Sequence, residues 1–387
     1  MVRLVLLAML VASASPAFGA IKLVLDQENV PWWQDLPFFH RDNRTLTPDN
    51  YKRLLGAYGP DHGFYQIAQA LFEDKAFSAY MQRQNGIRNN NVTIILVDDD
   101  KKSEKQKVWP HADALGRIFI GKSYFDGGGN DPAGARALVA HEFGHTQDRT
   151  FPSLWKPYGP DGSHFGDEII KPHAAFMEGW SQYNAFMWDP SEVSSAKWMA
   201  TNLRREVKPA KKGDPAYVDV KDPDYQDYLD NESVVGLVLF RIKLAHPDGE
   251  DRVRSVFKQT KNLLGFNTLL PGLLAHYVKS YPQDAALVAA ALDVTTGFKA
   301  PESELRKILG AHAGDYLPAV RDRLKAAFDD PKLARIPWAR PDKVLDGWLH
   351  PTPPVPQAAG SIAGGARGES DAGPQPTFNG LSQADGP

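Results

Sequence analysis

The stretch Ala137-Leu138-Val139-Ala140-His141-Glu142-Phe143-Gly144-His145 decides the fold that this sequence predicts. Just before it, Asn130-Asp131-Pro132 supplies capping residues followed by a first-turn proline, so we expect a helix to begin there. Residues four apart lie on one face of a helix, so His141 and His145 can reach a single metal ion. The stretch therefore predicts a helix that carries half of a metal site.

The spacing His-Glu-x-x-His is typical of zinc hydrolases, because the glutamate projects beside the two imidazoles. Zinc lowers the pKa of a bound water towards neutrality, and Glu142 is placed to take its proton. The activated water can then attack a peptide carbonyl. The alternative is a solvated His/Glu face on an ordinary amphipathic helix, whose apolar side would be Leu138, Val139 and Phe143.

A catalytic zinc needs a third protein ligand. One known pattern has a glycine three residues after the second histidine and a third histidine six residues after it, but Asp148 and Phe151 occupy those positions. The best candidate is Glu178, which lies on a second predicted helix over 171–187. The competing candidates lie between the two helices or at the start of the second: Asp161, His164, Glu168 and His173.

The segment Glu178-Gly179-Trp180-x-x-Tyr183 resembles the Glu-Gly-(aromatic)-x-x-Tyr segment of aminopeptidase-type gluzincins, whose Glu is the third zinc ligand. Glu178-x-x-Ser181 is also similar to the Glu-x-x-Ser-Asp segment of thermolysin-like enzymes, whose Asp orients a zinc-binding histidine. Gln182 holds that last position here and would act more weakly on the histidine. The resemblance covers about residues 115–190 and implies a zincin-like fold, one Zn2+ per chain and peptidase activity.

The resemblance also implies a residue that stabilises the transition state, since gluzincins use a Tyr or His from a later segment. Tyr228 is the candidate, with Tyr225 as a competitor and ordinary packing as the alternative for both. Tyr183 follows helical spacing with Phe176 and Trp180, so we expect it in the core.

The strand predicted at Arg117-Ile118-Phe119-Ile120 lies just before the metal helix. In zincin folds an edge strand at this place pairs with the extended substrate backbone. Ile118, Phe119 and Ile120 are therefore candidate substrate-binding residues, with a plain core strand as the alternative.

The order of elements predicts an α+β protein with a zincin-like catalytic domain, built from a mixed sheet and the metal helix and followed by a mainly helical lobe. Strands are expected at 21–25, 92–97 and 117–120, and helices at 64–81, 171–187 and 234–244. We predict a signal peptide at 1–19, a metallopeptidase domain at 20–345 and a disordered Pro/Gly/Ala-rich tail at 346–387. Within that domain the α/β part extends to about 190 and the helical part spans about 191–345.

The composition of the chain disfavours several classes of binding partner and excludes some kinds of active site. A formal net charge of −3 disfavours nucleic acid and anionic membrane surfaces, leaving a peptide or protein substrate. With no cysteine in the 387 residues, cysteine nucleophiles and cysteine-type zinc sites are excluded. Arg3, the apolar run Leu4–Val11 and the small residues after it resemble an export signal. We therefore expect a periplasmic or extracellular protein with no stable membrane insertion once the signal is removed.

Three other functions are consistent with these patterns. The chain could be a non-catalytic secreted module on a zincin fold, although the intact Glu142 favours an enzyme. The same metal chemistry could cleave peptidoglycan amides. Nine tryptophans would also allow a glycan-binding protein.

Overall fold

The computed structural model describes the chain at residues 21–26, 44–86, 91–100, 107–113, 115–126, 131–147, 166–207, 216–260, 269–333 and 337–350. The predicted export signal lies outside these stretches, as does the chain beyond residue 350. Helix α16 (Arg340–Leu349) continues past residue 345, so the predicted start of the tail at 346 falls inside a helix.

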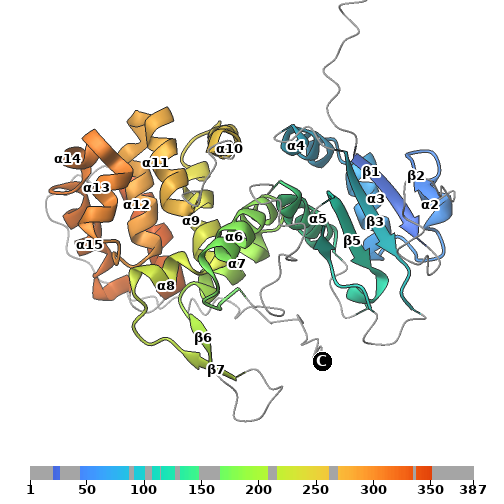
Figure 1. Ribbon diagram of the computed structural model, residues 1–387, viewed down its shortest axis with the longest axis horizontal. Helices are drawn as coiled ribbons and strands as arrows, with labels where there is room; N and C mark the ends of the chain where they lie inside the picture. The colour runs from blue at the N-terminus through green and yellow to red at the C-terminus, as the bar shows by residue number, and fades with distance from the viewer. Residues whose placement is uncertain are drawn as a thin grey trace, which may run out of the picture.

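Within the described residues, a five-stranded mixed sheet forms one end of the molecule (Figure 1). Its three central strands are parallel, and an antiparallel strand flanks them on each side, in the order β2-β1-β3-β5-β4. The bounds are β1 Ile21–Asp26, β2 Arg44–Leu46, β3 Val92–Val97, β4 His111–Ala112 and β5 Arg117–Gly121. Apolar side chains of β1, β3 and β5 pack against the helices that follow them. The parallel and antiparallel strand pairs confirm the predicted mixed sheet.

The prediction that β5 is an edge strand is wrong. Ile118 and Phe119 pair with β4, and Gly121 donates its N–H to the Val108 carbonyl at 3.1 Å. Ile118 and Ile120 are fully buried. The two-residue strand β4 takes the end of the sheet instead, and its shortness explains why no sequence pattern indicated it.

The helix predicted over 64–81 is two helices, α3 (Gly63–Phe72) and α4 (Lys75–Asn85). The break lies at Asp74, whose carboxylate accepts hydrogen bonds from the N–H groups of Ala76 and Phe77 at 3.0 Å. An aspartate that caps a new helix end satisfies two N–H groups that have no partner within the helix, which is why the chain breaks here.

Helices dominate the chain from residue 132 onwards, apart from the hairpin β6 (Arg204–Val207) and β7 (Ala216–Asp219). The helix that carries His141, Glu142 and His145 is α5 (Pro132–Thr146). The helices after it are α6 Pro172–Phe186, α7 Pro190–Met199, α8 Tyr225–Leu229, α9 Glu232–Leu244, α10 Gly249–Thr260, α11 Leu270–Ser280, α12 Ala285–Thr295, α13 Glu302–Leu309, α14 Ala313–Tyr316, α15 Val320–Phe328 and α16. The protein is thus α+β with a mainly helical second part.

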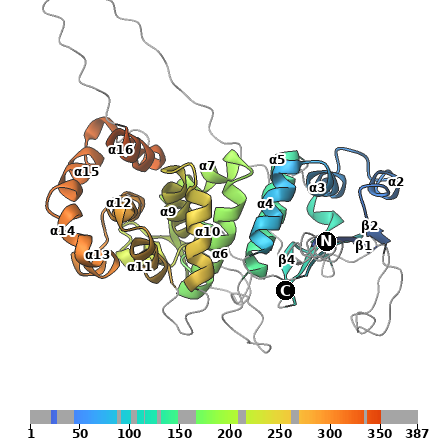
Figure 2. The same ribbon diagram turned by 90° about the horizontal axis from the view of Figure 1, so that it is seen from above.

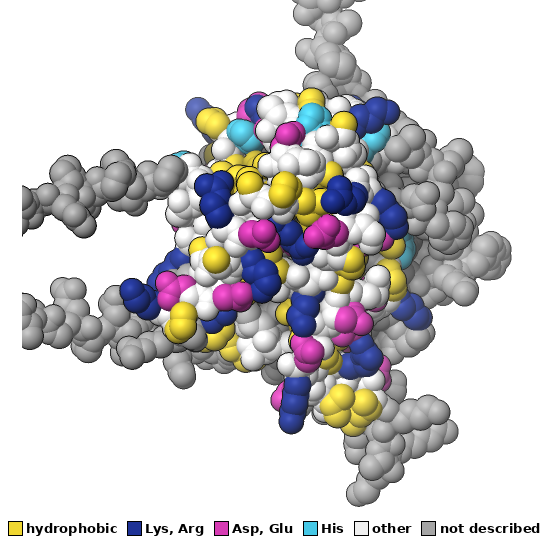
Figure 3. Space-filling view, turned by 90° about the vertical axis from the view of Figure 1, so that its left-hand side faces the viewer, with side chains coloured by type: hydrophobic (Ala, Val, Ile, Leu, Met, Phe, Trp, Pro, Cys, Tyr) yellow, Lys and Arg dark blue, Asp and Glu magenta, His cyan; other side chains and the backbone are white. Residues whose placement is uncertain are grey.

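Two hydrophobic cores meet at α5 and α6. One joins the sheet to α3, α4 and α5, and the other joins α6 to the later helices. Figures 1 and 2 show α5 and α6 side by side between the sheet and the helical part. The outer face of the helical part carries interspersed acidic and basic side chains (Figure 3). In the described part of the chain, no helix has the length and apolar character required to span a membrane.

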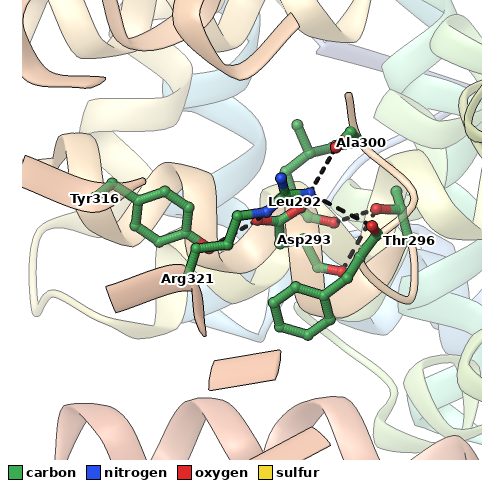
Figure 4. A network of polar contacts seen from close by, with 7 residues as sticks. Leu292, Asp293, Thr296, Ala300, Tyr316 and Arg321 are labelled. Carbon is green, nitrogen blue, oxygen red and sulfur yellow. Dashed lines mark hydrogen bonds and ion pairs between the residues drawn. The ribbon is translucent and has the colours of Figure 1, made fainter. Parts of the chain in front are cut away.

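A buried ion pair holds the helical part together (Figure 4). Asp293 on α12 is fully buried and accepts from Arg321 Nε of α15 at 2.9 Å and from the Tyr316 hydroxyl at 2.9 Å. Arg321 also donates to the Ala300 carbonyl at 2.6 Å. Three elements are therefore fixed to one carboxylate.

Candidate metal centre

Helix α5 begins where the sequence predicts. The Asp131 carboxylate accepts hydrogen bonds from the N–H groups of Ala133 and Gly134, both at 2.8 Å, and Pro132 occupies the first turn. With its N-terminus fixed in this way, the helix carries His141, Glu142 and His145 in its last two turns.

Helix α6 lies unusually close to α5 at the glycine of the motif. A Cβ atom on Gly144 would lie 2.6 Å from Ser181 Oγ and 2.7 Å from Ser181 Cα, closer than real Cβ contacts. Only glycine permits this approach. Glu178 lies one turn before Ser181 on α6, so the contact brings its carboxylate to the histidines.

A buried polar network fixes α6 from the side away from the histidines. The Trp180 indole donates to Gln147 Oε1 at 2.7 Å, and the Gln147 amide donates to Gln84 of α4 at 3.1 Å. The Tyr80 hydroxyl donates to Asn184 Oδ1 at 2.6 Å. Buried hydrogen bonds are costly to leave unmade, so this network sets the position of α6 relative to α4 and α5.

Helix α9 packs against the other side of α6 through two more glycines. A Cβ on Gly179 would clash with the Val235 side chain, and a Cβ on Gly236 would lie 3.1 Å from the Gly179 carbonyl. Helix α6 is thus packed closely between α5 and α9.

The three predicted ligands meet at one point. His141 Nε2 lies 3.4 Å from Glu178 Oε2, His145 Nε2 lies 3.2 Å from the same oxygen, and the two Nε2 atoms are 3.2 Å apart. Among the described residues, these three form the group that could hold a metal ion. The prediction that Glu178 joins the two histidines is therefore consistent with the structure.

The size of the triangle is compatible with a tetrahedral metal site. Bonds of about 2.0–2.1 Å in a tetrahedral arrangement separate the ligand atoms by about 3.3–3.4 Å. The three observed separations, 3.2 to 3.4 Å, match one face of such a tetrahedron. Two imidazoles and a carboxylate are also a donor set of catalytic zinc sites, in which a fourth position stays open.

No protein-family model, curated protein or solved structure matches this chain. Its function therefore has to be argued from the chemistry of the site.

The charges of the ligand group favour a cation. Burial opposes ionisation of Glu178, but the charge of His145 and the hydrogen bonds from both imidazoles hold the pKa of Glu178 well below its usual range. Burial alone would lower the pKa of His145, yet the charge and hydrogen bond of Glu178 raise this pKa to about 9. A bound cation would stabilise the ionised Glu178 in the same way as a positive charge on His145 does.

Glu142 differs from Glu178 in its surroundings. Its side chain is buried, and among the described residues no group donates a hydrogen bond to its Oε2 atom. Burial raises the pKa of Glu142, while the nearby charges of His145 and His141 partly oppose this rise. A buried carboxylate oxygen left without a partner is costly, so its retention beside the ligands favours a role in binding water or substrate.

The other candidates lie elsewhere. Glu168 is buried in an ion pair with Arg204, 3.2 Å away, and His173 begins α6 outside the ligand group. Asp161 and His164 lie outside the described residues. Gln182 is expected to orient a histidine, but its amide donates a hydrogen bond to Glu232 of α9 at 3.4 Å.

The two tyrosines proposed to stabilise the transition state face the helical part. The Tyr228 hydroxyl lies near Gly297, and its ring packs with the apolar cluster between α7 and α9. Tyr225 packs against the helical core, where burial and the nearby charges of Glu304 and Asp293 raise its pKa. The structure does not bring either tyrosine to the ligand group. The expected burial of Tyr183 is confirmed.

Three residues near the site carry no sequence signal. The charge of His111 on β4 helps to hold down the pKa of Glu142. Tyr124 follows β5, and burial together with the charges of Glu192 and Glu142 raises its pKa to about 12. Burial also raises the pKa of Glu192 on α7, which the charge of His141 partly opposes. Folding alone brings these residues to the motif, since they are distant from it in the sequence.

Proposed function

We propose that this chain is a zinc-dependent metallopeptidase with a zincin-like catalytic domain. His141, His145 and Glu178 bind one zinc ion, and Glu142 is the general base. The observation that carries the proposal is the 3.2–3.4 Å triangle of ligand atoms with the buried, unbonded oxygen of Glu142 beside it. A purely structural metal site needs no such base, so Glu142 favours an enzyme over a binding protein.

Zinc at this position would activate water and polarise a substrate carbonyl. Glu142 Oε2 accepts the proton of the attacking water and later releases it to the leaving amine. Its raised pKa suits both steps, because a general base works best when its pKa lies near the working pH. Glu178 stays ionised throughout, since its pKa is held low.

The substrate backbone would run along β4, which occupies the end of the sheet that we expected of β5. Helix α5 contacts both β4 and β5, so a strand added beside β4 would lie next to the metal helix. We further propose that the enzyme acts after export, on peptides or proteins in the periplasm or outside the cell.

The test compares zinc content and peptide hydrolysis in the wild-type protein, Glu142→Gln and His145→Ala. Wild-type protein should hold about one zinc per chain and cleave peptides. Glu142→Gln should keep its zinc and lose roughly 10²–10⁴-fold in kcat, the usual contribution of a general base. His145→Ala should lose the zinc.

A matched control is Glu302→Gln, which removes an exposed carboxylate on α13 and should change neither property. If Glu142→Gln hydrolyses peptides as fast as the wild-type protein, the proposed role of Glu142 is wrong. If the wild-type protein binds no zinc, the metal assignment fails as well.

A further inference from the structure

The segment that leads into β4 is fixed firmly to the sheet. The Val108 N–H donates to the buried Asp99 carboxylate at 2.8 Å, and the Val108 carbonyl accepts from Gly121 at 3.1 Å. The N–H and hydroxyl of Ser123 bind the same carboxylate at 2.9 and 2.7 Å. The residue that follows Val108 is therefore held in one place.

That residue is Trp109, and 45% of its surface is exposed. Its ring meets Tyr124 edge-on, with the centroids 6.3 Å apart. Its carbonyl lies 2.8 Å from His111 Nδ1, and the His111 ring stacks on Phe119 at 5.0 Å. This large aromatic side chain is therefore held at its backbone and partly exposed to solvent.

Trp109 lies two residues before His111, the first residue of β4, and α5, which carries Glu142, contacts both β4 and β5. The exposed indole is therefore on the segment that enters the end strand of the sheet, and that strand packs against the helix of the proposed general base. Exposed tryptophans of this kind are the side chains that most often anchor a bound partner.

We propose that Trp109 determines substrate specificity, by contacting a large apolar or aromatic side chain of a peptide that lies along β4. This inference rests on the proposed peptidase function, because the contacted side chain belongs to a peptide whose scissile bond lies at the metal centre. A peptide is favoured over a glycan because the same segment offers backbone hydrogen bonds at the end of a sheet, which an extended peptide can pair with.

The test uses a series of internally quenched peptides in which Phe, Leu, Ala or Asp occupies each position around the cleaved bond. At one position the wild-type enzyme should prefer Phe and Leu over Ala by roughly tenfold in kcat/KM, the scale of discrimination by an apolar contact. Trp109→Ala should reduce this preference to less than threefold, mainly through KM.

The control is Trp338→Ala, which removes a tryptophan of similar exposure, 42%, from the far helical part. It should keep the wild-type preference. If Trp109→Ala keeps the preference, or if both variants lose it equally, the proposal is overturned. Zinc content and melting temperature confirm that each variant is folded.

A binding experiment separates this proposal from the peptidase function. Zinc-loaded Glu142→Gln protein is titrated with the Phe and Ala peptides, and with a soluble chitin oligomer as the glycan probe. Tighter binding of the Phe peptide that is lost when Trp109 is also replaced supports the proposal, even if the wild-type protein shows no hydrolysis. Equal binding of the two peptides, or Trp109-dependent binding of the oligomer alone, overturns it.

Discussion

Replacing Gly144 with alanine should weaken zinc binding while leaving the protein folded. The added methyl carbon would lie 2.7 Å from Ser181 Cα, whereas ordinary contact begins at 3.4 Å. The Ser181 hydroxyl can rotate away, but Cα belongs to the backbone, so α6 itself must retreat. The difference between 3.4 and 2.7 Å gives a displacement of about 0.7 Å.

Glu178 moves with that displacement, because it lies one turn before Ser181 on the same helix. Metal sites hold their ligand distances to within about 0.2 Å, so a shift three times larger removes a good third ligand. We expect the Kd for zinc to rise roughly 10–100-fold, as when groups that orient a ligand are lost. Stability should fall by at most about 2 kcal/mol, because about 1 kcal/mol of helix propensity gained by alanine partly offsets about 1–3 kcal/mol of overpacking.

The assay is competition for zinc against a chromophoric chelator, with Gly134→Ala as the matched control. Gly134 lies in the same helix, and a Cβ there meets Asp131 Oδ2 at 3.4 Å, which is ordinary contact. Gly134→Ala should bind zinc like the wild-type protein. Wild-type zinc affinity in Gly144→Ala would refute the idea that the close α5–α6 contact positions Glu178.

Two other predictions concern stability. First, the metal-free protein should become less stable as the pH rises from about 6.5 to about 9. The pKa of His145 is raised to about 9 in the folded state, so its contribution is complete below the unfolded value of 6.5 and disappears as the pH passes 9. Urea unfolding at pH 6, 7.5 and 9 measures this, and a fall of equal size in zinc-loaded protein would contradict it. Second, Arg321→Ala should cost about 3–5 kcal/mol, because it leaves the fully buried Asp293 without its cation. The control Arg306→Ala breaks an exposed pair and should cost less than about 1 kcal/mol, so similar urea midpoints for the two variants would contradict the burial argument.

The elements that the sequence predicts well are those specified by local chemistry. The β-branched run 92–97 forms β3, and the Asp131-Pro132 pair starts α5 at the expected residue. The helix predicted at 64–81 fails for a local reason too. The sequence pattern around Asp74 fits a continuous helix. Only the hydrogen bonds that its carboxylate accepts from the following N–H groups identify it as a cap.

The residues of the site also fall into those that local sequence predicts and those that depend on the packing of distant segments. The relation of His141, Glu142 and His145 follows from helical spacing and could be predicted with the motif alone. Glu178 required a resemblance, because nothing in the intervening chain fixes how two helices cross. The packing of β4 against α5 could not be predicted, since β4 is a strand of two residues with no periodic pattern.

Small residues, more than the ligands themselves, set the precision of this centre. Imidazole and carboxylate side chains have several rotamers each, and a ligand triangle with edges of 3.2–3.4 Å forms only if the two helix backbones are already placed to a fraction of an ångström. Gly144 and Gly179 allow three helix backbones to approach closely, and the Trp180 indole bonds α6 to Gln147 at the end of α5. Zinc affinity should therefore depend on residues that do not contact the metal. The same three ligands on more loosely packed helices should bind zinc less tightly.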